Sequence, residues 1–262
     1  MKLIREEFYS IEELLKTLRN KENNEVMRDE HSSQKSDYSF TKTHSYKEAE
    51  ELITNGYVEI LDQIKAGIKF KATENSKVIP EDNVFGYVPN VPNAIMNLPK
   101  SMIYQKRAPR KITTIDLIYF FTGSCSVESD EFIKTGIKLL NIINSLEKNN
   151  VRIKLSTTVY AGKTDKELAV SYVNLKNYRE KLNLQKICFP IAHPSLFRRF
   201  GFKWLETTEQ IEDRGWTHGY GRPPKRQDLE DSNFFTDKNR KSLIFNEIKD
   251  LSEEQIIAKY LN

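Results

Sequence analysis

The sequence has few cysteines, few histidines and no long apolar run, and each scarcity argues against a class of protein. Two cysteines among 262 residues, Cys125 and Cys188, give neither a disulfide framework nor closely spaced zinc ligands. Four scattered histidines add no metal-binding spacing. No apolar run approaches the length of a membrane span, and the N-terminus MKLIREEFYS is charged too early for a signal peptide. We therefore expect a cytoplasmic protein that has no membrane partner.

The sequence also lacks a strong excess of charge of one sign. It contains 41 basic and 37 acidic residues, which leaves a net charge of +4. This balance gives only a weak indication of polyanion binding and does not choose the partner. The length allows one large domain, or one domain with a sizeable appendage.

One complete strand–helix–strand unit is present between Ile115 and Gly162. A nearly unbroken apolar run predicts a central strand up to Phe121, and apolar residues at three- and four-residue spacing predict a helix from Ser129 to Lys148. Alternation from Val151 predicts a second strand. A crossover this short implies a right-handed parallel unit.

Capping patterns and polar stretches divide the rest of the chain into further segments. Ser and Glu at capping-box spacing predict helices beginning after Ser10 and Ser45. We divide the chain as follows: 1–43, an N-terminal helix and a polar linker from Asn20; 44–110, a helical hairpin and an irregular Pro-rich connection; 111–230, the α/β core; and 231–262, a C-terminal helical segment opened by a Ser252–Gln255 capping box.

Three short segments complete the predicted core. We expect a strand over Leu168–Leu175, a short helix over Tyr178–Leu184 and a buried strand over Ile187–Ala192. Lys100–Lys111 is interpreted as an edge strand with a solvated basic rim, against the alternative of a phosphate-binding stripe. The Gly-, Pro- and aromatic-rich Arg214–Arg226 predicts an ordered loop.

The loop Thr122-Gly123-Ser124-Cys125-Ser126, with the strand before it and the helix after it, resembles the opening of a von Willebrand factor A-type domain. In that family an Asp-x-Ser-x-Ser loop holds a divalent cation. Ser124 and Ser126 match the two serines, but Thr122 stands where the family has aspartate, so the charged ligand of a hard cation is missing. The resemblance covers about Ile112 to Phe202 and implies at most a weakly held cation such as Mg²⁺ on Ser124 and Ser126.

A second resemblance concerns the setting of the protein rather than its activity. The run that includes AHPSLFRRFGF and GYGRPP is similar to uncharacterised proteins encoded by bacteriophages and integrated mobile elements. It implies that the protein is encoded by a bacteriophage or mobile element. From the residue patterns and the first resemblance, we expect a three-layer α/β protein with a mostly parallel, von Willebrand A-like sheet, a helical N-terminal region and a C-terminal helix.

If the A-type strand order holds, the strands ending at Phe121 and Ala192 are neighbours, and the loops after them meet at one crevice. The residues expected in this binding crevice are Thr122, Ser124, Ser126, His193 and Ser195. The interpretation that we prefer is a non-enzymatic interaction protein that binds a macromolecular partner, most simply another protein, through a degenerate A-type domain.

Two alternatives use other residues. A nucleic-acid-binding surface would combine basic and aromatic side chains, with these candidates: Arg198, Arg199, Lys203, Trp216, Tyr220 and Arg222. The competing interpretation is that the aromatics pack inside and the arginines pair with nearby acids. A hydrolase would use Cys125 as nucleophile and His193 as base, but the sequence offers no third orienting group.

Overall fold

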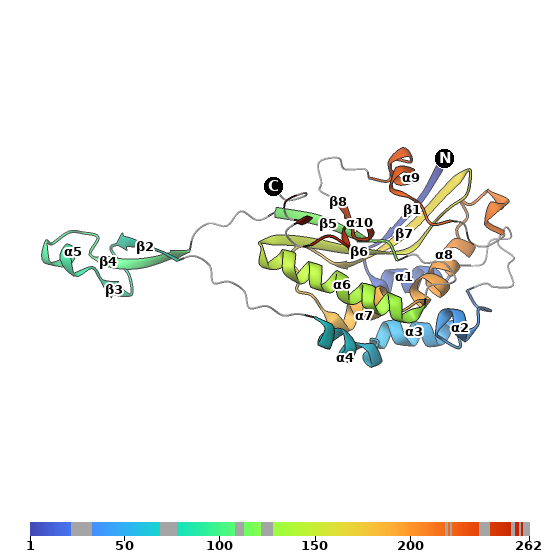
Figure 1. Ribbon diagram of the computed structural model, residues 1–262, viewed down its shortest axis with the longest axis horizontal. Helices are drawn as coiled ribbons and strands as arrows, with labels where there is room; N and C mark the ends of the chain where they lie inside the picture. Colours follow the sequence, from blue (N-terminus) through green and yellow to red (C-terminus); the bar gives the residue numbers. More distant parts are fainter. Residues whose placement is uncertain are drawn as a thin grey trace. The chain divides into compact units, whose positions relative to one another are not determined.

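The chain divides into two compact units (Figure 1). Met1–Lys69 and Thr113–Asn262 form the larger unit, which we call the body, and Phe70–Ile112 forms the small unit. The structure, a computed structural model, describes residues 1–21, 33–68, 78–107, 113–121, 128–217, 220, 222–235, 242–252, 255–256 and 258. None of the helices among these residues combines the length and apolar character needed to cross a bilayer.

The body is built on a five-stranded sheet with the order β1-β7-β6-β5-β8. Its strands are β1 (Lys2–Phe8), β5 (Thr113–Tyr119), β6 (Val151–Lys163), β7 (Glu167–Lys176) and β8 (Ser242–Ile244). Only β6 and β7 are antiparallel neighbours, whereas the other three pairs are parallel. The prediction of an α/β protein with a mostly parallel sheet is confirmed, and the antiparallel β6–β7 pair makes the sheet mixed.

The strand–helix–strand unit is present as predicted. Helix α6 (Ser129–Lys148) connects β5 to β6, and the two strands pair in parallel with Leu117 opposite Leu155. Ile115, Leu117 and Tyr119 alternate into the main core, while Ile118 and Phe120 contribute to a smaller apolar cluster on the other face. The apolar run is therefore continuous because both faces of β5 are covered.

The strand predicted over Ile187–Ala192 is wrong. These residues belong to helix α7 (Leu184–Ala192), whose N-cap Asn183 accepts a hydrogen bond from the Lys186 amide. The helix predicted over Tyr178–Leu184 is also wrong, because α7 begins only at Leu184. The expected adjacency of two strands ending at Phe121 and Ala192 therefore does not exist; β6 and β8 are the neighbours of β5.

Helices cover one face of the sheet (Figure 1). This layer contains α1 (Ile11–Arg19), α3 (Tyr46–Asn55), α4 (Val58–Gly67), α6 and α7. The predicted caps are confirmed, since Ser10 and Ser45 accept hydrogen bonds from Glu13 and Glu48 amides at 3.2 and 3.1 Å. The opposite face carries α9 (Arg226–Asp231) over the smaller apolar cluster.

Two short helical segments follow α7 and pack into the main core. The π-helical segment η1 (Leu196–Gly201) leads into α8 (Phe202–Glu206), and both are largely buried. A Cβ atom at Gly201 would lie 2.3 Å from the carbonyl oxygen of Val159 in β6. Only glycine allows this close approach of helix and strand. The remaining elements are a 3-10 turn, η2 (Arg214–Thr217), and α10 (Phe245–Ile248).

Part of the predicted polar linker is buried in the body. Residues 22–32 lie outside the described residues, but Ser33, Thr41 and Thr43 have no exposed surface. The short helix α2 (Tyr38–Thr41) lies in this segment, with Asp37 as its N-cap. The linker prediction is therefore wrong from Ser33 to Thr43, because polar side chains there bond to the core instead of to water.

The small unit is a three-stranded antiparallel sheet with the order β2-β4-β3. Its elements are β2 (Val78–Asn83), β3 (Val88–Pro89), α5 (Val91–Ile95) and β4 (Met102–Arg107). The strand predicted within Lys100–Lys111 is confirmed, but β4 is the central strand and not an edge. The irregular connection predicted over Ile79–Pro99 is wrong, since it contains β2, β3 and α5.

Candidate functional site

The predicted crevice at the carboxyl end of β5 is described only in part. Thr122, Ser124, Cys125 and Ser126 lie outside the described residues. At the strand end itself, the Phe121 amide donates to Thr158 Oγ1 at 2.8 Å. Across the described chain, no three His, Cys, Asp or Glu side chains are grouped so that they could hold a metal ion.

His193 and Ser195 lie in the interior, with 2% and 0% of their surface exposed. The His193 ring stacks on Phe189, and its Nδ1 accepts a hydrogen bond from the Ser195 amide at 3.1 Å. Burial, with a smaller effect of the nearby Arg199 charge, lowers the pKa of His193 to about 3. Ser195 Oγ donates to the Thr41 carbonyl at 2.6 Å. Both residues therefore hold the interior together and do not line an open crevice.

Arg199 has no exposed surface and forms the centre of a polar cluster. Its guanidinium donates five hydrogen bonds: two to Thr43 (Oγ1 and O), one to Thr41 Oγ1, and one each to the carbonyls of Ser33 and Ser36. All five acceptors are uncharged. Burial lowers the pKa of Arg199, because nothing in this shell matches the hydration that the cation loses.

Arg198 is also buried and bonds to the same part of the chain. It donates to the Phe40 carbonyl at 2.6 Å, and its guanidinium carbon lies 4.2 Å from the centre of the Phe40 ring. Arg198 and Arg199 thus lock Ser33–Thr43 onto η1. Because both side chains are interior, neither belongs to an exposed basic surface that a phosphate backbone could reach.

The other predicted nucleic-acid residues are divided between core and surface. Trp216 is fully buried, and Tyr220 stacks on Phe202 with ring centres 3.8 Å apart while donating to Glu206 at 2.6 Å. Lys203 is half-buried and Arg222 is exposed. The structure therefore leaves two of the six predicted residues at the surface, and the aromatic side chains are used for packing.

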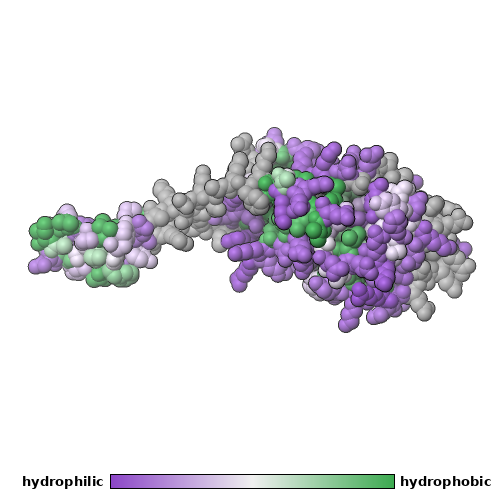
Figure 2. Space-filling model, turned by 90° about the horizontal axis from the view of Figure 1, so that it is seen from below, coloured by the Kyte–Doolittle hydropathy of each residue, from purple (hydrophilic) through white to green (hydrophobic). Residues whose placement is uncertain are grey.

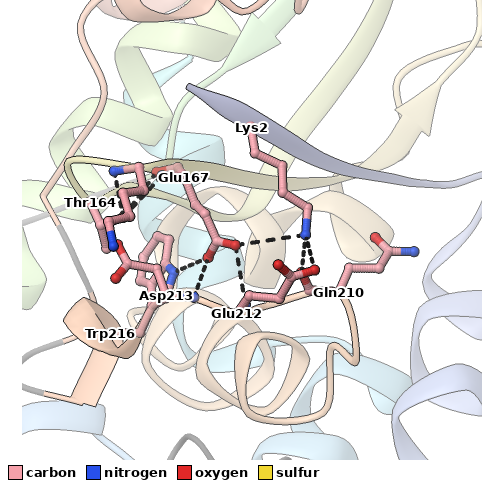
Figure 3. A network of polar contacts seen from close by, with 8 residues as sticks. Lys2, Thr164, Glu167, Gln210, Glu212, Asp213 and Trp216 are labelled. Carbon is pink, nitrogen blue, oxygen red and sulfur yellow. Dashed lines mark hydrogen bonds and ion pairs between the residues drawn. The ribbon is translucent and has the colours of Figure 1, made fainter.

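A polar network around Glu167 was not anticipated from the sequence (Figure 3). The Glu167 carboxylate, 2% exposed, accepts hydrogen bonds from Trp216 Nε1 at 2.9 Å and from the amides of Glu212 and Asp213 at 3.1 and 3.2 Å. Lys2 Nζ lies 3.8 Å from the same carboxylate and 2.7 Å from Glu212. With donors on both oxygens, Glu167 fixes the turn that leads into η2.

A groove of about 190 Å³ crosses the sheet face opposite the helical layer. Tyr172 lies in it, accepting from Arg5 Nε at 3.1 Å and donating to Glu7 at 2.9 Å. Lys154 pairs with the other Glu7 oxygen at 3.3 Å, and Tyr178 donates to Asp116 at the far end. Lys154 and Glu7 form an ion pair, whereas Arg5 bonds to Tyr172 and the Phe234 carbonyl. With Asp116, the lining contains two cations and two carboxylates, so the groove presents no net charge to a ligand.

The small unit has a surface of a different kind. None of its described side chains from Ile79 to Gln105 is buried. It carries ten of the fourteen exposed large hydrophobic residues in the described chain, which we call the apolar surface: Ile79, Val84, Phe85, Tyr87, Val88, Val91, Ile95, Met96, Leu98 and Tyr104. In the view of Figure 2, apolar residues lie at the upper left and along the lower edge of this unit. Exposed apolar clusters of this kind mark interaction sites.

The comparison with protein families bears on the whole chain. The sequence model of DUF7192, a domain of unknown function, matches residues 2–259. The chain belongs to the DUF7192 family. No curated protein and no solved structure matches the sequence. The small unit, residues 70–112, lies inside the region that the DUF7192 model matches. The apolar surface is therefore part of the DUF7192 domain of this protein.

A sequence signal for the apolar surface was available. From Asn83 to Pro99 there is no Asp, Glu, Lys or Arg, although such residues make up 30% of the chain. The four prolines between Ile79 and Pro99 favoured an irregular connection over a folded unit. The lack of charge in this stretch, taken by itself, predicts an apolar surface.

Proposed function

We propose that the protein is a non-enzymatic interaction protein that docks onto another protein through the apolar surface of the small unit. The observation that carries this proposal is the lack of any buried side chain between Ile79 and Gln105. A three-stranded sheet normally needs a covered hydrophobic face to be stable in water. A partner that covers the apolar surface would supply the burial that the described part of this unit lacks.

The potential catalytic groups among the described residues favour binding over chemistry. His193 is buried with a lowered pKa, so it is a neutral side chain that solvent and substrates do not reach. Cys188 is fully buried in α7, and burial raises the pKa of its thiol to about 11, which leaves it protonated and unreactive. Both groups behave as packing residues.

The finer parts of the proposal concern the body. We propose that the α/β core predicted over residues 111–230, whose sheet also includes β1 and β8, is a degenerate von Willebrand A-like domain; the parallel unit β5–α6–β6 and the serines in the sequence after β5 support this. We also propose a bacteriophage or mobile-element origin and a cytoplasmic location; the scarcity of cysteine supports the location.

Nucleic-acid binding is the weaker alternative. It would depend on Lys203 and Arg222, without the buried Arg198 and Arg199. A phosphate backbone requires basic partners, and these would have to come from outside the uncharged stretch Asn83–Pro99, for example from Lys100.

The experiment is an affinity purification of the full chain from its source cells, with matched variants. Val91→Asn places an amide in the apolar surface, and Val58→Asn makes the same change at a residue of α4; the two valines are 58% and 61% exposed. We expect a protein at a fixed ratio to copurify with wild type and Val58→Asn, and to be lost with Val91→Asn. Copurification that is equal for all three forms, or nuclease-sensitive recovery, would contradict the proposal.

A further inference from the structure

We infer that the partner is a different protein with a concave, mainly apolar surface that contacts both faces of the β2-β4-β3 sheet at once. This inference rests on the proposed function and adds the shape and chemistry of the partner. It follows from the distribution of the apolar surface, from the protection of the sheet edges and from the absence of charge between Asn83 and Pro99.

The first face of the sheet carries an aromatic and aliphatic patch beside the exposed Glu81. In an antiparallel pair, residues opposite one another share a face, and alternate residues along a strand do so too. Glu81 pairs with Tyr104 in the register of β2 and β4, so Ile79, two residues before Glu81, shares the face of Tyr104. The Phe85 ring packs on Tyr104 with centres 5.2 Å apart. Phe85 remains 62% exposed, so this patch has no cover of its own.

The second face is mixed, since it carries the apolar side chains of Val88 and Ile103 together with polar ones. Val88 pairs with Ile103, which shares this face with Asp82 and Gln105. Asp82 accepts hydrogen bonds from the side chains of Asn90 and Asn93 at 2.9 and 3.1 Å, and this places α5 on the same side.

Helix α5 then adds its own exposed residues to the second face. Val91 and Ile95 are one turn apart and 58% and 79% exposed. Polar bonds therefore fix α5 against the sheet, while its aliphatic side chains point away from it.

The sheet edges do not offer a place for an added strand. Pro80 lies inside the outer strand β2 and has no N–H to donate, and Glu81 and Asp82 follow it. The other outer strand, β3, has two residues and ends in Pro89. Edge prolines, edge charges and very short edge strands prevent the addition of a further strand in natural sheets. Recognition of this unit therefore depends on side chains and not on backbone pairing.

The composition of the surface selects a protein over an anionic partner. The cores of protein–protein interfaces are poor in charge and rich in aromatic residues and Met, as is the uncharged stretch with Phe85, Tyr87 and Met96. Phosphates of nucleic acids or lipids would find no cation within that stretch.

A second copy of the chain is a poor occupant for geometric reasons. A twofold dimer places the same patch of each copy face to face. Such a contact covers one face of the small sheet and leaves either Phe85 or Ile95 in water. A concave partner surface covers both, and it can also supply the area of a standard interface from a unit of this size.

The test uses a photo-crosslinking residue, p-benzoylphenylalanine, placed singly in the full chain in its source cells. Position 85 reports on the first face, position 95 on the second, and position 9, where Tyr9 is 73% exposed in the body, is the matched aromatic control. We expect adducts of one mass from positions 85 and 95 and none from position 9. Mass spectrometry identifies the adduct, and the affinity of the purified partner should fall about tenfold or more for Val91→Asn and remain unchanged for Val58→Asn.

The other outcomes separate this inference from the proposed function. Adducts from only one face, or adducts made of two copies of this chain, overturn the concave partner and leave an interaction protein. No adduct at either position overturns both proposals. Binding of the purified chain to phosphatidylcholine vesicles that is lost with Val91→Asn also overturns both, because it assigns the surface to a membrane.

Discussion

Replacing Arg199 with Met should destabilise the body by about 3–5 kcal/mol. Met has a similar length but no donors, so the carbonyls of Ser33, Ser36 and Thr43 would lose their hydrogen bonds inside the protein. Each buried acceptor left without a donor costs about 1–3 kcal/mol, and removal of a buried cation returns part of that cost. Lys at this position should recover little, because one ammonium cannot reach five separate acceptors.

The assay is urea unfolding of the full chain, with hydrogen exchange as a local measurement. With a slope of about 3 kcal/mol per M, the midpoint should fall by about 1–1.7 M. Arg222→Met is the control, since that side chain is exposed and its backbone pairing with Lys163 is unaffected. Amides of Ser33–Thr43 should exchange faster in Arg199→Met. An unchanged midpoint would refute the reasoning, since it would mean that burying the cation costs as much as its hydrogen bonds contribute.

Three further changes test other parts of the body. The pKa of His193 falls from 6.5 in the unfolded chain to about 3 in the folded protein. Between these values the unfolded state binds more protons, so the folded protein loses stability as pH falls through them. His193→Asn should remove about 2–3 kcal/mol of the stability loss between pH 6.5 and 4.5, as measured by urea unfolding at each pH. Gly201→Ala should destabilise the body by about 2 kcal/mol or more, because the added Cβ meets a backbone oxygen. Gly215→Ala, whose Cβ would lie 3.2 Å from a side-chain oxygen, should destabilise it less, and thermal melts of both variants measure the difference. Glu167→Gln should destabilise the body by about 2–3 kcal/mol, because Trp216 Nε1 loses a charged acceptor. Urea unfolding followed by tryptophan fluorescence measures this loss, and equal midpoints for the two forms would contradict the expectation.

The central unit was predictable because its signals are local and repeated. Helix α6 is long and has one apolar stripe, and Ser10 and Ser45 cap helices through side chains three residues from their targets. Such patterns depend on neighbouring residues alone. They can therefore be recognised in the sequence without any knowledge of the tertiary structure.

Helix α7 failed as a prediction because it has almost no polar stripe. All residues from Ile187 to Ala192 are buried, so the helical period is erased, and Pro190 inside the helix argued against it. A short apolar run buried on every side reads equally as a strand. Only the packing of α7 against α4 and α6 decides between them, and the local sequence does not contain this information.

The interior role of Arg198 and Arg199 was beyond sequence reasoning for another reason. Arginine is rarely fully buried, and the aromatics beside it made a stacking surface the natural interpretation. The acceptors that hold Arg199 lie between Ser33 and Thr43, about 160 positions earlier, and several are backbone carbonyls that any residue type supplies. The residue types in Ser33–Thr43 therefore do not predict that this segment binds Arg199.

The contrast between the two units is a physical argument for where recognition takes place. In the body, the buried cation Arg199 and the buried carboxylate Glu167 already have partners, and the groove across the sheet neutralises its own charges. Groups that are already paired gain little from a ligand, because each new bond replaces an old one. In the small unit, Phe85 and Ile95 expose apolar side chains to water, so a partner that buries them would gain hydrophobic free energy on binding. The free energy available for association is therefore concentrated in the apolar surface.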